Sequence, residues 1–139
     1  MNAMRGNLLH NEPLARHTSW RIGGPAKRYY EPKDIDDLAE FLQQLAAEEP
    51  VFWLGLGSNL LVRDGGVAGT VIAAFRALGG LDRIDEQRVR VGAGVACPQV
   101  GRFCSQQGLC GVEFLAGIPG TLGGALARLF VKIVQYGQS

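Results

Sequence analysis

The sequence predicts a small globular fold that contains both helices and strands and opens with a β-α-β unit. After Asp34, apolar residues recur at the spacing of an amphipathic helix of about three turns. These residues are Ile35, Leu38, Phe41, Leu42 and Leu45. Asp34 or Asp36 is available to cap its first amides. Pro50 closes the segment, and the compact apolar run at 51–54 has the length of a strand.

The segment before this helix is expected to supply the first strand. Residues 1–17 are polar, and we expect them to be irregular. Over 18–25 an aromatic and a β-branched residue lead up to Gly23-Gly24-Pro25. This pattern indicates a short strand that ends in a sharp turn.

The remaining apolar segments are short and are separated by turn residues. Strands are expected at 60–62 and 70–72, joined through the turn at 64–66. A hairpin is expected from 81–84 and 89–91. Further elements are a helix that begins near Pro98 and ends at Gly108, and a strand at 112–115.

Composition narrows the possible classes of protein. Of the 139 residues, 47% are hydrophobic and 19% are charged, so a folded core is expected without disulfides. The formal net charge of +1 comes with scattered arginines, which disfavours nucleic acid or an anionic membrane as a partner. No run approaches the ~18 apolar residues of a membrane span, and no signal peptide precedes residue 13. A cytoplasmic location is expected.

Cysteine and histidine give no sign of a metal site. Cys97, Cys104 and Cys110 lack the spacing of zinc ligands and are expected to be reduced thiols in the core. His10 and His17 lie in the polar leader, with no carboxylate or cysteine expected around them. No function is assigned to either histidine.

A glycine-rich loop follows the strand at 51–54, in the sequence Leu54-Gly55-Leu56-Gly57-Ser58-Asn59-Leu60-Leu61. Glycine permits unusual backbone angles and removes Cβ atoms, so successive amides can form a concave nest for a phosphate oxygen. A diphosphate is the expected ligand, with Ser58 and Asn59 adding side-chain hydrogen bonds. The alternative is a tight turn that needs glycine only for its backbone.

Two other nucleotide motifs do not fit this loop. A P-loop would place Gly-Lys-Ser/Thr at its end, but Ser58-Asn59 and two leucines follow Gly57. A dinucleotide fingerprint would place a third glycine at the start of a long helix, but position 60 is leucine. Neither P-loop nor Rossmann binding is therefore expected.

A second glycine-rich loop spans 117–124 and contains four glycines and Pro119 but no charged residue. It could let the backbone approach a flat or phosphate-bearing ligand, or its glycines could serve packing between two sheets. Since each glycine loop is expected to follow a strand, we expect both to meet one extended ligand across a cleft.

Three ordered motifs carry a family resemblance. They are Asn11-Glu12-Pro13-Leu14-Ala15-Arg16-His17-Thr18 with Ile22-Gly23-Gly24-Pro25-Ala26, then Leu54 to Gly66, then Gly117-Ile118-Pro119-Gly120-Thr121-Leu122-Gly123-Gly124-Ala125. In order and spacing, over about 9–127, they resemble UDP-N-acetylenolpyruvoylglucosamine reductases. The resemblance implies an α+β FAD-binding fold of the vanillyl-alcohol-oxidase type, with two small α/β lobes at 1–75 and 76–139, the second incomplete and the substrate domain absent.

The resemblance also implies a cofactor site and a reaction. FAD would lie between the lobes, with its diphosphate on the first loop. NADPH would reduce the flavin, which would reduce the enolpyruvyl group of a UDP-sugar to give UDP-N-acetylmuramate for peptidoglycan. The implied cofactor-binding residues are Gly55, Leu56, Gly57, Ser58, Asn59, Leu60, Gly117, Ile118, Pro119, Gly120, Thr121, Gly123 and Gly124.

The resemblance ends after Leu126, where the family continues with an Asn-Ala-Gly segment and this chain does not. A frameshifted or shortened reading frame is expected, although a genuine short variant stays open. The family's catalytic arginine, serine and glutamate have no counterpart, and Arg21, Arg63 and Glu113 are not expected to replace them. The chain alone is expected to be inactive and to retain FAD weakly or not at all.

Two alternatives remain open. The chain could be a non-catalytic module that binds a nucleotide or a partner, or part of another flavoprotein of the same fold. The segment from Asn11 to Ala26 argues against the second alternative.

Overall fold

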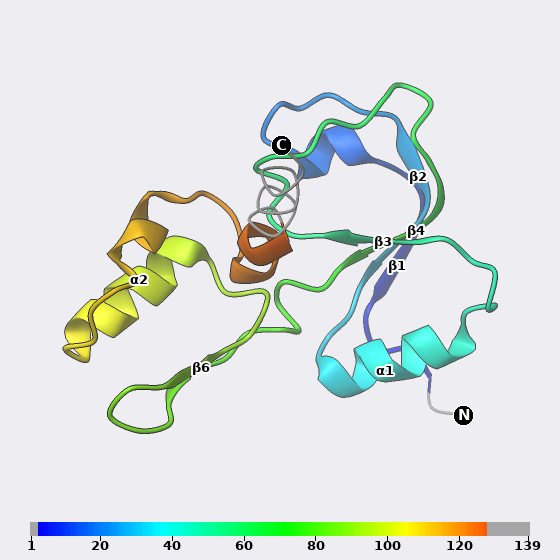
Figure 1. The fold of residues 1–139 in the computed structure, drawn as a ribbon. Coiled ribbons are helices and arrows are strands. Elements are labelled where there is room, and N and C mark those ends of the chain that lie inside the picture. Colours follow the sequence, from blue (N-terminus) through cyan, green and yellow to red (C-terminus); the bar gives the residue numbers. More distant parts are fainter. Residues whose placement is uncertain (1–2, 128–139) are drawn as a thin grey trace, which may run out of the picture. The chain divides into compact units, whose positions relative to one another are not determined.

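The computed structural model describes residues 3–127, which contain both helices and strands (Figure 1). The predicted α+β class is confirmed. The chain divides into two compact units, Met1–Leu78 and Gly79–Ser139. Their identity with the two lobes expected at 1–75 and 76–139 stays a prediction. Most of the atypical tail, from residue 128 onward, lies outside the described residues.

The first unit is built on a four-stranded sheet with the order β1-β2-β4-β3. Its strands are β1 (Asn7–Pro13), β2 (Pro25–Glu31), β3 (Val51–Leu54) and β4 (Val67–Ala73). β1 runs antiparallel to β2, whereas β2 and β3 both run parallel to the central β4. The predicted β-α-β unit is therefore β2-α1-β3, and its crossover leaves room for β4 between the two strands.

Helix α1 (Ile35–Gln44) covers one face of this sheet (Figure 1). Its N-cap is Asp34, whose carboxylate accepts a hydrogen bond of 2.9 Å from the amide of Asp37. Phe41 stacks on Tyr30 of β2 with ring centroids 3.8 Å apart. Because strand side chains alternate between faces, Tyr30 joins the core under α1 while Tyr29 joins a second core on the opposite face.

A buried carboxylate ties the N-terminal strand to this helix. Asp37 has no exposed surface and accepts hydrogen bonds from the amides of Arg5 and Lys33 at 2.8 Å and from the Tyr30 hydroxyl at 2.9 Å. Burial acts to raise the pKa of Asp37, but these three donors and the charge of Arg5 outweigh it, so its pKa lies below the ordinary value. Desolvation of the charge is thus offset by hydrogen bonds to the charged form.

The second unit contains the predicted hairpin, β5 (Leu81–Arg83) with β6 (Val89–Val91), and the predicted helix, α2 (Cys97–Gln106). Pro98 lies in the first turn of α2, where its missing N–H costs nothing. A short 3₁₀ helix, η2 (Glu113–Gly117), and helical residues 122–127 complete its described part. The core gathers Val95, Cys97, Val100, Cys104, Leu115 and Ala125.

The N-terminal segment differs from expectation. Residues 1–17 are not irregular, because β1 and a 3₁₀ helix, η1 (Leu14–His17), lie within them. β1 is an edge strand with Leu8 and Leu9 half-buried, and such a strand tolerates polar residues on its exposed positions. The strand expected at 18–25 is also wrong, since β2 begins only at Pro25.

Three further expectations are wrong. Residues 60–62 pair with no strand in the described part of the chain, and 112–115 enters the η2 helix instead of extending. Gly111 has a φ of +103° there, a left-handed angle that turns the chain before any ladder can start. Cys110 is exposed, whereas Cys97 and Cys104 are buried as expected, and burial raises the pKa of the Cys97 thiol.

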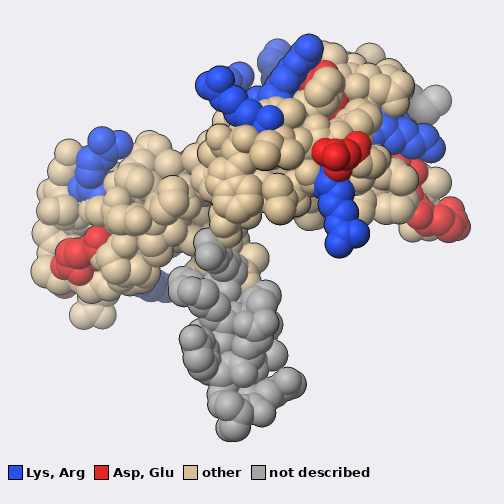
Figure 2. All heavy atoms as spheres, turned by 90° about the horizontal axis from the view of Figure 1, so that it is seen from above, with Lys and Arg blue, Asp and Glu red and all other residues tan. Residues whose placement is uncertain are grey.

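Within residues 3–127, no helix combines the length and apolar character that crossing a bilayer requires. Acidic and basic side chains are interspersed on the face drawn in Figure 2.

Candidate functional site

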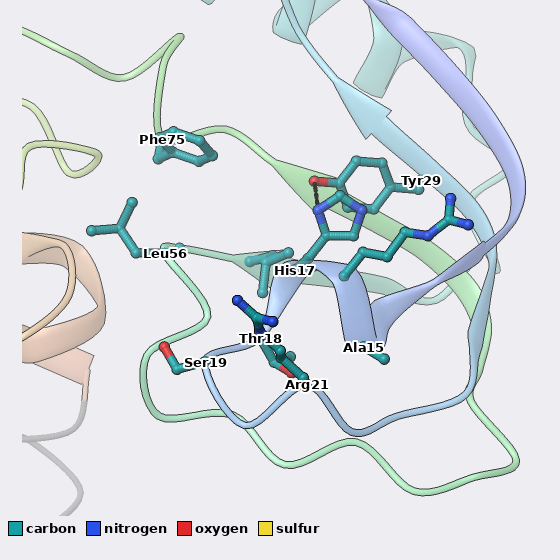
Figure 3. Close-up of a pocket in the computed structure, with 11 residues that line it drawn as sticks. Ala15, His17, Thr18, Ser19, Arg21, Tyr29, Leu56 and Phe75 are labelled. Carbon is teal, nitrogen blue, oxygen red and sulfur yellow. Dashed lines mark hydrogen bonds between the residues drawn. The ribbon is translucent and has the colours of Figure 1, made fainter.

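A cavity of about 810 Å³ opens in the first unit, beside the carboxyl end of β3 (Figure 3). Clefts at the carboxyl ends of parallel strands are common ligand sites in α/β sheets. Its wall is formed by the turn after η1, by Tyr29 of β2, by the start of the first glycine loop and by Phe75 beyond β4. The lining residues are Ala15, Arg16, His17, Thr18, Ser19, Arg21, Tyr29, Leu54, Gly55, Leu56 and Phe75.

The first glycine loop, which we define as residues 55–60, rests on the backbone of residues 17–19. Gly57 has a φ of +68°, in the left-handed region that favours glycine, and its carbonyl accepts a hydrogen bond of 3.0 Å from the amide of Ser19. A Cβ atom at position 57 would overlap the carbonyl oxygen of His17. Glycine is therefore required here for packing as well as for the backbone angle.

The amides of the first glycine loop are left available to a ligand. Among residues 3–127, no protein acceptor takes a hydrogen bond from the backbone N–H groups of 55–60. Ser58 and Asn59, expected to add side-chain donors, likewise bond to no described residue, and Asn59 is exposed. Gly55 and Leu56 line the cavity itself. Free amides at a glycine bend are a suitable nest for an anion.

Two arginines add positive charge to the cavity wall. Arg16 is largely exposed, and its guanidinium lies 3.9 Å from Glu12, a weak surface pair. Arg21 has a φ of +54°, unusual for a residue with a side chain, and donates its amide to the Thr18 carbonyl at 3.2 Å. The turn thus holds Arg21 at the cavity by a strained backbone. This placement makes it a candidate contact for a negative ligand.

A histidine cluster that the sequence did not suggest lies in the same wall. His17 Nε2 is 3.0 Å from Glu12 Oε1, and Nδ1 is 3.2 Å from the Tyr29 hydroxyl. The two rings also stack, with centroids 4.3 Å apart. The expectation that no carboxylate surrounds His17 is therefore wrong. The contact depends on β1 and β2 pairing, and residues 1–17 were expected to be irregular.

Tyr29 is held in its protonated form. Its hydroxyl contacts Glu31 Oε1 at 3.1 Å as well as His17. Burial, followed by the negative charge of Glu31 and the hydrogen bond to it, raises the pKa of Tyr29 well above its ordinary value. Tyr29 is therefore a neutral hydrogen-bonding group in this wall.

The second glycine loop, residues 117–124 in the second unit, uses most of its amides internally. The amides of Leu122 and Gly123 donate to the carbonyls of Val95 and Ala93 at 2.8 and 2.9 Å. Gly124 donates to Thr121 Oγ1 at 3.2 Å, and Ile118 donates to the Leu115 carbonyl at 3.2 Å.

Two amides of the second glycine loop have no acceptor among the residues described. The glycines of this loop also differ in how closely other atoms pack against them. The N–H groups of Gly120 and Thr121 donate to no acceptor among the residues described. A Cβ on Gly123 would lie 2.9 Å from the Ala93 Cβ, whereas one on Gly117 would meet nothing within 4 Å. Gly123 is therefore needed for packing, but against a turn residue and not between two sheets as the alternative stated. Convergence of the two glycine loops on one ligand stays a prediction, because they belong to separate units.

Comparison with known proteins places the chain in a family. Residues 26–131 match the family described as FAD binding domain. The chain belongs to the FAD binding domain family. The first glycine loop lies within the matched region, whereas the cavity is lined both by residues of that region and by residues 15–21, which precede it.

The chain is also similar to named reductases, as its motifs predicted. It is 57% identical to the UDP-N-acetylenolpyruvoylglucosamine reductase of Methylococcus capsulatus over 123 residues, covering 88% of this chain and 40% of that protein. It is 58% identical to the reductase of Nitrosococcus oceani over 125 residues, which cover 90% of this chain and 42% of that protein.

A solved structure agrees with this likeness. The chain resembles the crystal structure of UDP-N-acetylenolpyruvylglucosamine reductase (MurB) from Thermus caldophilus with a TM-score of 0.61 and a sequence identity of 34%. The match covers 88% of this chain and 41% of that one. The predicted family resemblance is confirmed. This FAD binding domain chain spans about 40% of the length of the curated relatives.

Proposed function

We propose that the first glycine loop holds the diphosphate of FAD, as part of a UDP-N-acetylenolpyruvoylglucosamine reductase. The observation that carries this proposal is the set of unused amides at 55–60, arranged around Gly57 in a left-handed conformation. A diphosphate needs several donors and a compensating positive charge, and both are present beside one cavity.

The residues divide into three roles. Amides of Gly55 to Leu60 would donate hydrogen bonds to phosphate oxygens, with Ser58 and Asn59 supplying side-chain donors. Arg16 and Arg21, which line the cavity, would offset the charge of the diphosphate. Gly57 fixes the bend by resting on the His17 carbonyl.

The second glycine loop is proposed as a further FAD contact, with fewer donors. Gly120 and Thr121 have the amides that remain available, and helical residues begin at 122, so a positive helix end lies beside them. Gly117, Ile118, Pro119, Gly123 and Gly124 would contribute backbone contact rather than hydrogen bonds.

For the whole protein we propose the reaction named in its relatives. FAD, when bound, supplies the hydride chemistry that carries electrons from NADPH to the enolpyruvyl double bond of a UDP-sugar, in the cytoplasmic synthesis of peptidoglycan precursors. No catalytic residue is assigned in this chain, and the chain by itself is proposed to be inactive. The measurement is NADPH oxidation in the presence of the enolpyruvyl UDP-sugar, and turnover by the purified chain would contradict this.

The cofactor proposal is tested by titrating the isotopically labelled chain with FAD and following its amide NMR resonances. We expect the resonances of 55–60 to shift, at FAD concentrations well above those needed by a tight flavoprotein, while those of α1 stay in place. Riboflavin is the matched control ligand, because it carries the same ring without phosphates. Absence of a shift at 55–60 with FAD, or an equal shift with riboflavin, would overturn the proposal.

A further inference from the structure

The segment from residue 14 to residue 24 forms a closed loop against the sheet of the first unit. The amide of Leu14 donates to the Gly24 carbonyl at 3.1 Å, which joins the two ends. Leu14 is buried, and so is Thr18, whose hydroxyl lies 3.4 Å from the Ile22 carbonyl. This closed loop carries the His17 to Ser19 backbone on which Gly57 rests.

His17 is the side chain that fastens the closed loop to β2. Its ring lies between Glu12 at the end of β1 and Tyr29 in the middle of β2. It also stacks on the Tyr29 ring (Figure 3). Glu12 and Tyr29 are themselves largely buried. A ring with two directed hydrogen bonds and a stacking contact has few alternative positions.

The hydrogen-bonding rules keep the ring in place whichever protons it carries. A carboxylate can only accept, so the contact with Glu12 requires a proton on Nε2. In the neutral ring Nδ1 accepts from the Tyr29 hydroxyl. In the protonated ring Nδ1 donates to that hydroxyl, whose own proton then goes to Glu31, 3.1 Å away. In both states the ring keeps its contacts with Glu12 and Tyr29, whereas the single Tyr29 hydroxyl proton goes to His17 Nδ1 in the neutral ring and to Glu31 in the protonated ring.

Only two residues of backbone connect the His17 ring to the contact with the first glycine loop, residues 55–60. The His17 carbonyl faces Gly57, and two residues later the Ser19 amide donates to the Gly57 carbonyl at 3.0 Å. The backbone of residues 17–19, on which Gly57 rests, forms a platform for the first glycine loop. A shift of the His17 side chain would move this platform and would change the directions of the free amides at 55–60. Anion nests depend on such directions, because several N–H groups must point at one site.

We propose that His17 is a positioning residue for the phosphate-binding loop, held by Glu12 and Tyr29 so that its backbone fixes the shape of residues 55–60. This inference rests on the proposed FAD function and adds to it a residue that acts without contact to the phosphates. By pre-organising the amides, His17 lowers the cost of ordering the loop when the cofactor binds.

The test compares His17→Ala with His10→Ala in the 139-residue chain. His10 is an exposed histidine in β1 and is the matched control. Amide hydrogen exchange is followed at Ser19, whose bond reports on the platform, and at Val71 in β4, which reports on the whole unit. FAD affinity is measured in the same samples from the NMR titration.

In His17→Ala we expect Ser19 to exchange about tenfold faster while Val71 is unchanged. FAD affinity should fall about tenfold, as expected from loss of pre-organisation. His17→Gln, which keeps a donor for Glu12, should recover part of both effects. His10→Ala should change neither.

Other outcomes overturn the inference in distinguishable ways. Unchanged exchange at Ser19, or faster exchange at Ser19 with unchanged FAD affinity, means that His17 does not position the nest. If Val71 exchange also rises, the decisive variant is Tyr29→Phe, which deletes only the hydroxyl, and an unchanged FAD affinity there rejects the inference. If the unaltered chain shows no FAD response, the proposed function itself has failed and the inference falls with it.

Discussion

The two glycine loops have similar compositions, but their backbone amides differ in whether they donate to acceptors within the protein. In the first, the amides of 55–60 donate to no acceptor among the described residues, although Gly57 is buried. In the second, the amide of Ile118 donates to Leu115, and those of Leu122, Gly123 and Gly124 donate to residues 93–95 or to the loop itself. The N–H groups of Gly120 and Thr121 donate to no acceptor within residues 3–127. The first loop therefore leaves its amides open to an external acceptor, whereas the second uses most of its amides within its own unit.

Glycine itself serves a different purpose in each loop. Gly57 is needed because its backbone angle is left-handed and a carbonyl lies against its Cα. Gly123 is needed because Ala93 packs directly against it. Glycine density alone does not distinguish a ligand site from a close-packed turn, whereas the destination of each amide does.

The largest effect is expected from Gly57→Ala. The substitution places a side chain at a φ of +68° and against the His17 carbonyl. We expect the free energy of unfolding of the first unit to fall by at least ~2 kcal/mol, since a left-handed non-glycine residue alone costs about 1–2 kcal/mol. Both tryptophans, Trp20 and Trp53, lie in this unit, so their fluorescence in a urea titration measures the change.

The matched control for this prediction is Gly65→Ala in the neighbouring turn. A Cβ at position 65 would meet nothing within 4 Å, and its φ is not left-handed. We expect a change below about 0.5 kcal/mol, as for most surface substitutions. Equal effects of the two substitutions would mean that the loop does not rest on His17 as described.

A smaller effect, confined to the second unit, is expected from Gly123→Ala. The added methyl would lie 2.9 Å from the Ala93 Cβ, and relieving such overpacking costs about 1–3 kcal/mol. Amide exchange at Val100 in α2 should become faster, while the tryptophan fluorescence transition stays unchanged. Gly117→Ala, which meets nothing within 4 Å, is the control. A loss of FAD response at 55–60 without a stability change would assign Gly123 to the cofactor instead.

Much of the fold follows from local sequence. The helix after Asp34 and the strand at 51–54 were predictable because periodicity and capping are properties of neighbouring residues. The strand at 7–13 was not, because its polar positions are stabilised by pairing with β2, a partner 18 residues further along. Edge strands of this kind have weak local signals.

Part of the candidate site was likewise predictable from local sequence, and part was not. The first glycine loop was recognisable from its composition, but its support by His17 was not, since the His17 contacts are with Glu12 and Tyr29 across two paired strands. Tyr29 and Glu31, two residues apart on one strand, share a face and form the local part of that signal. The rest requires knowing that β1 pairs with β2.

The smallest effect is expected from Thr121→Ala, which also tests the boundary between the two roles. Thr121 Oγ1 accepts the Gly124 amide at 3.2 Å at the start of the helical residues 122–127, and losing such a cap costs about 1 kcal/mol. Thr121→Ser keeps the acceptor and should restore most of this stability, measured again by exchange at Val100. The substitution frees the Gly124 amide while leaving that of Thr121 in the backbone. If the second loop is chiefly structural, FAD affinity should therefore change no more than about twofold, whereas a loss of tenfold or more would show that the Thr121 hydroxyl itself contacts the cofactor.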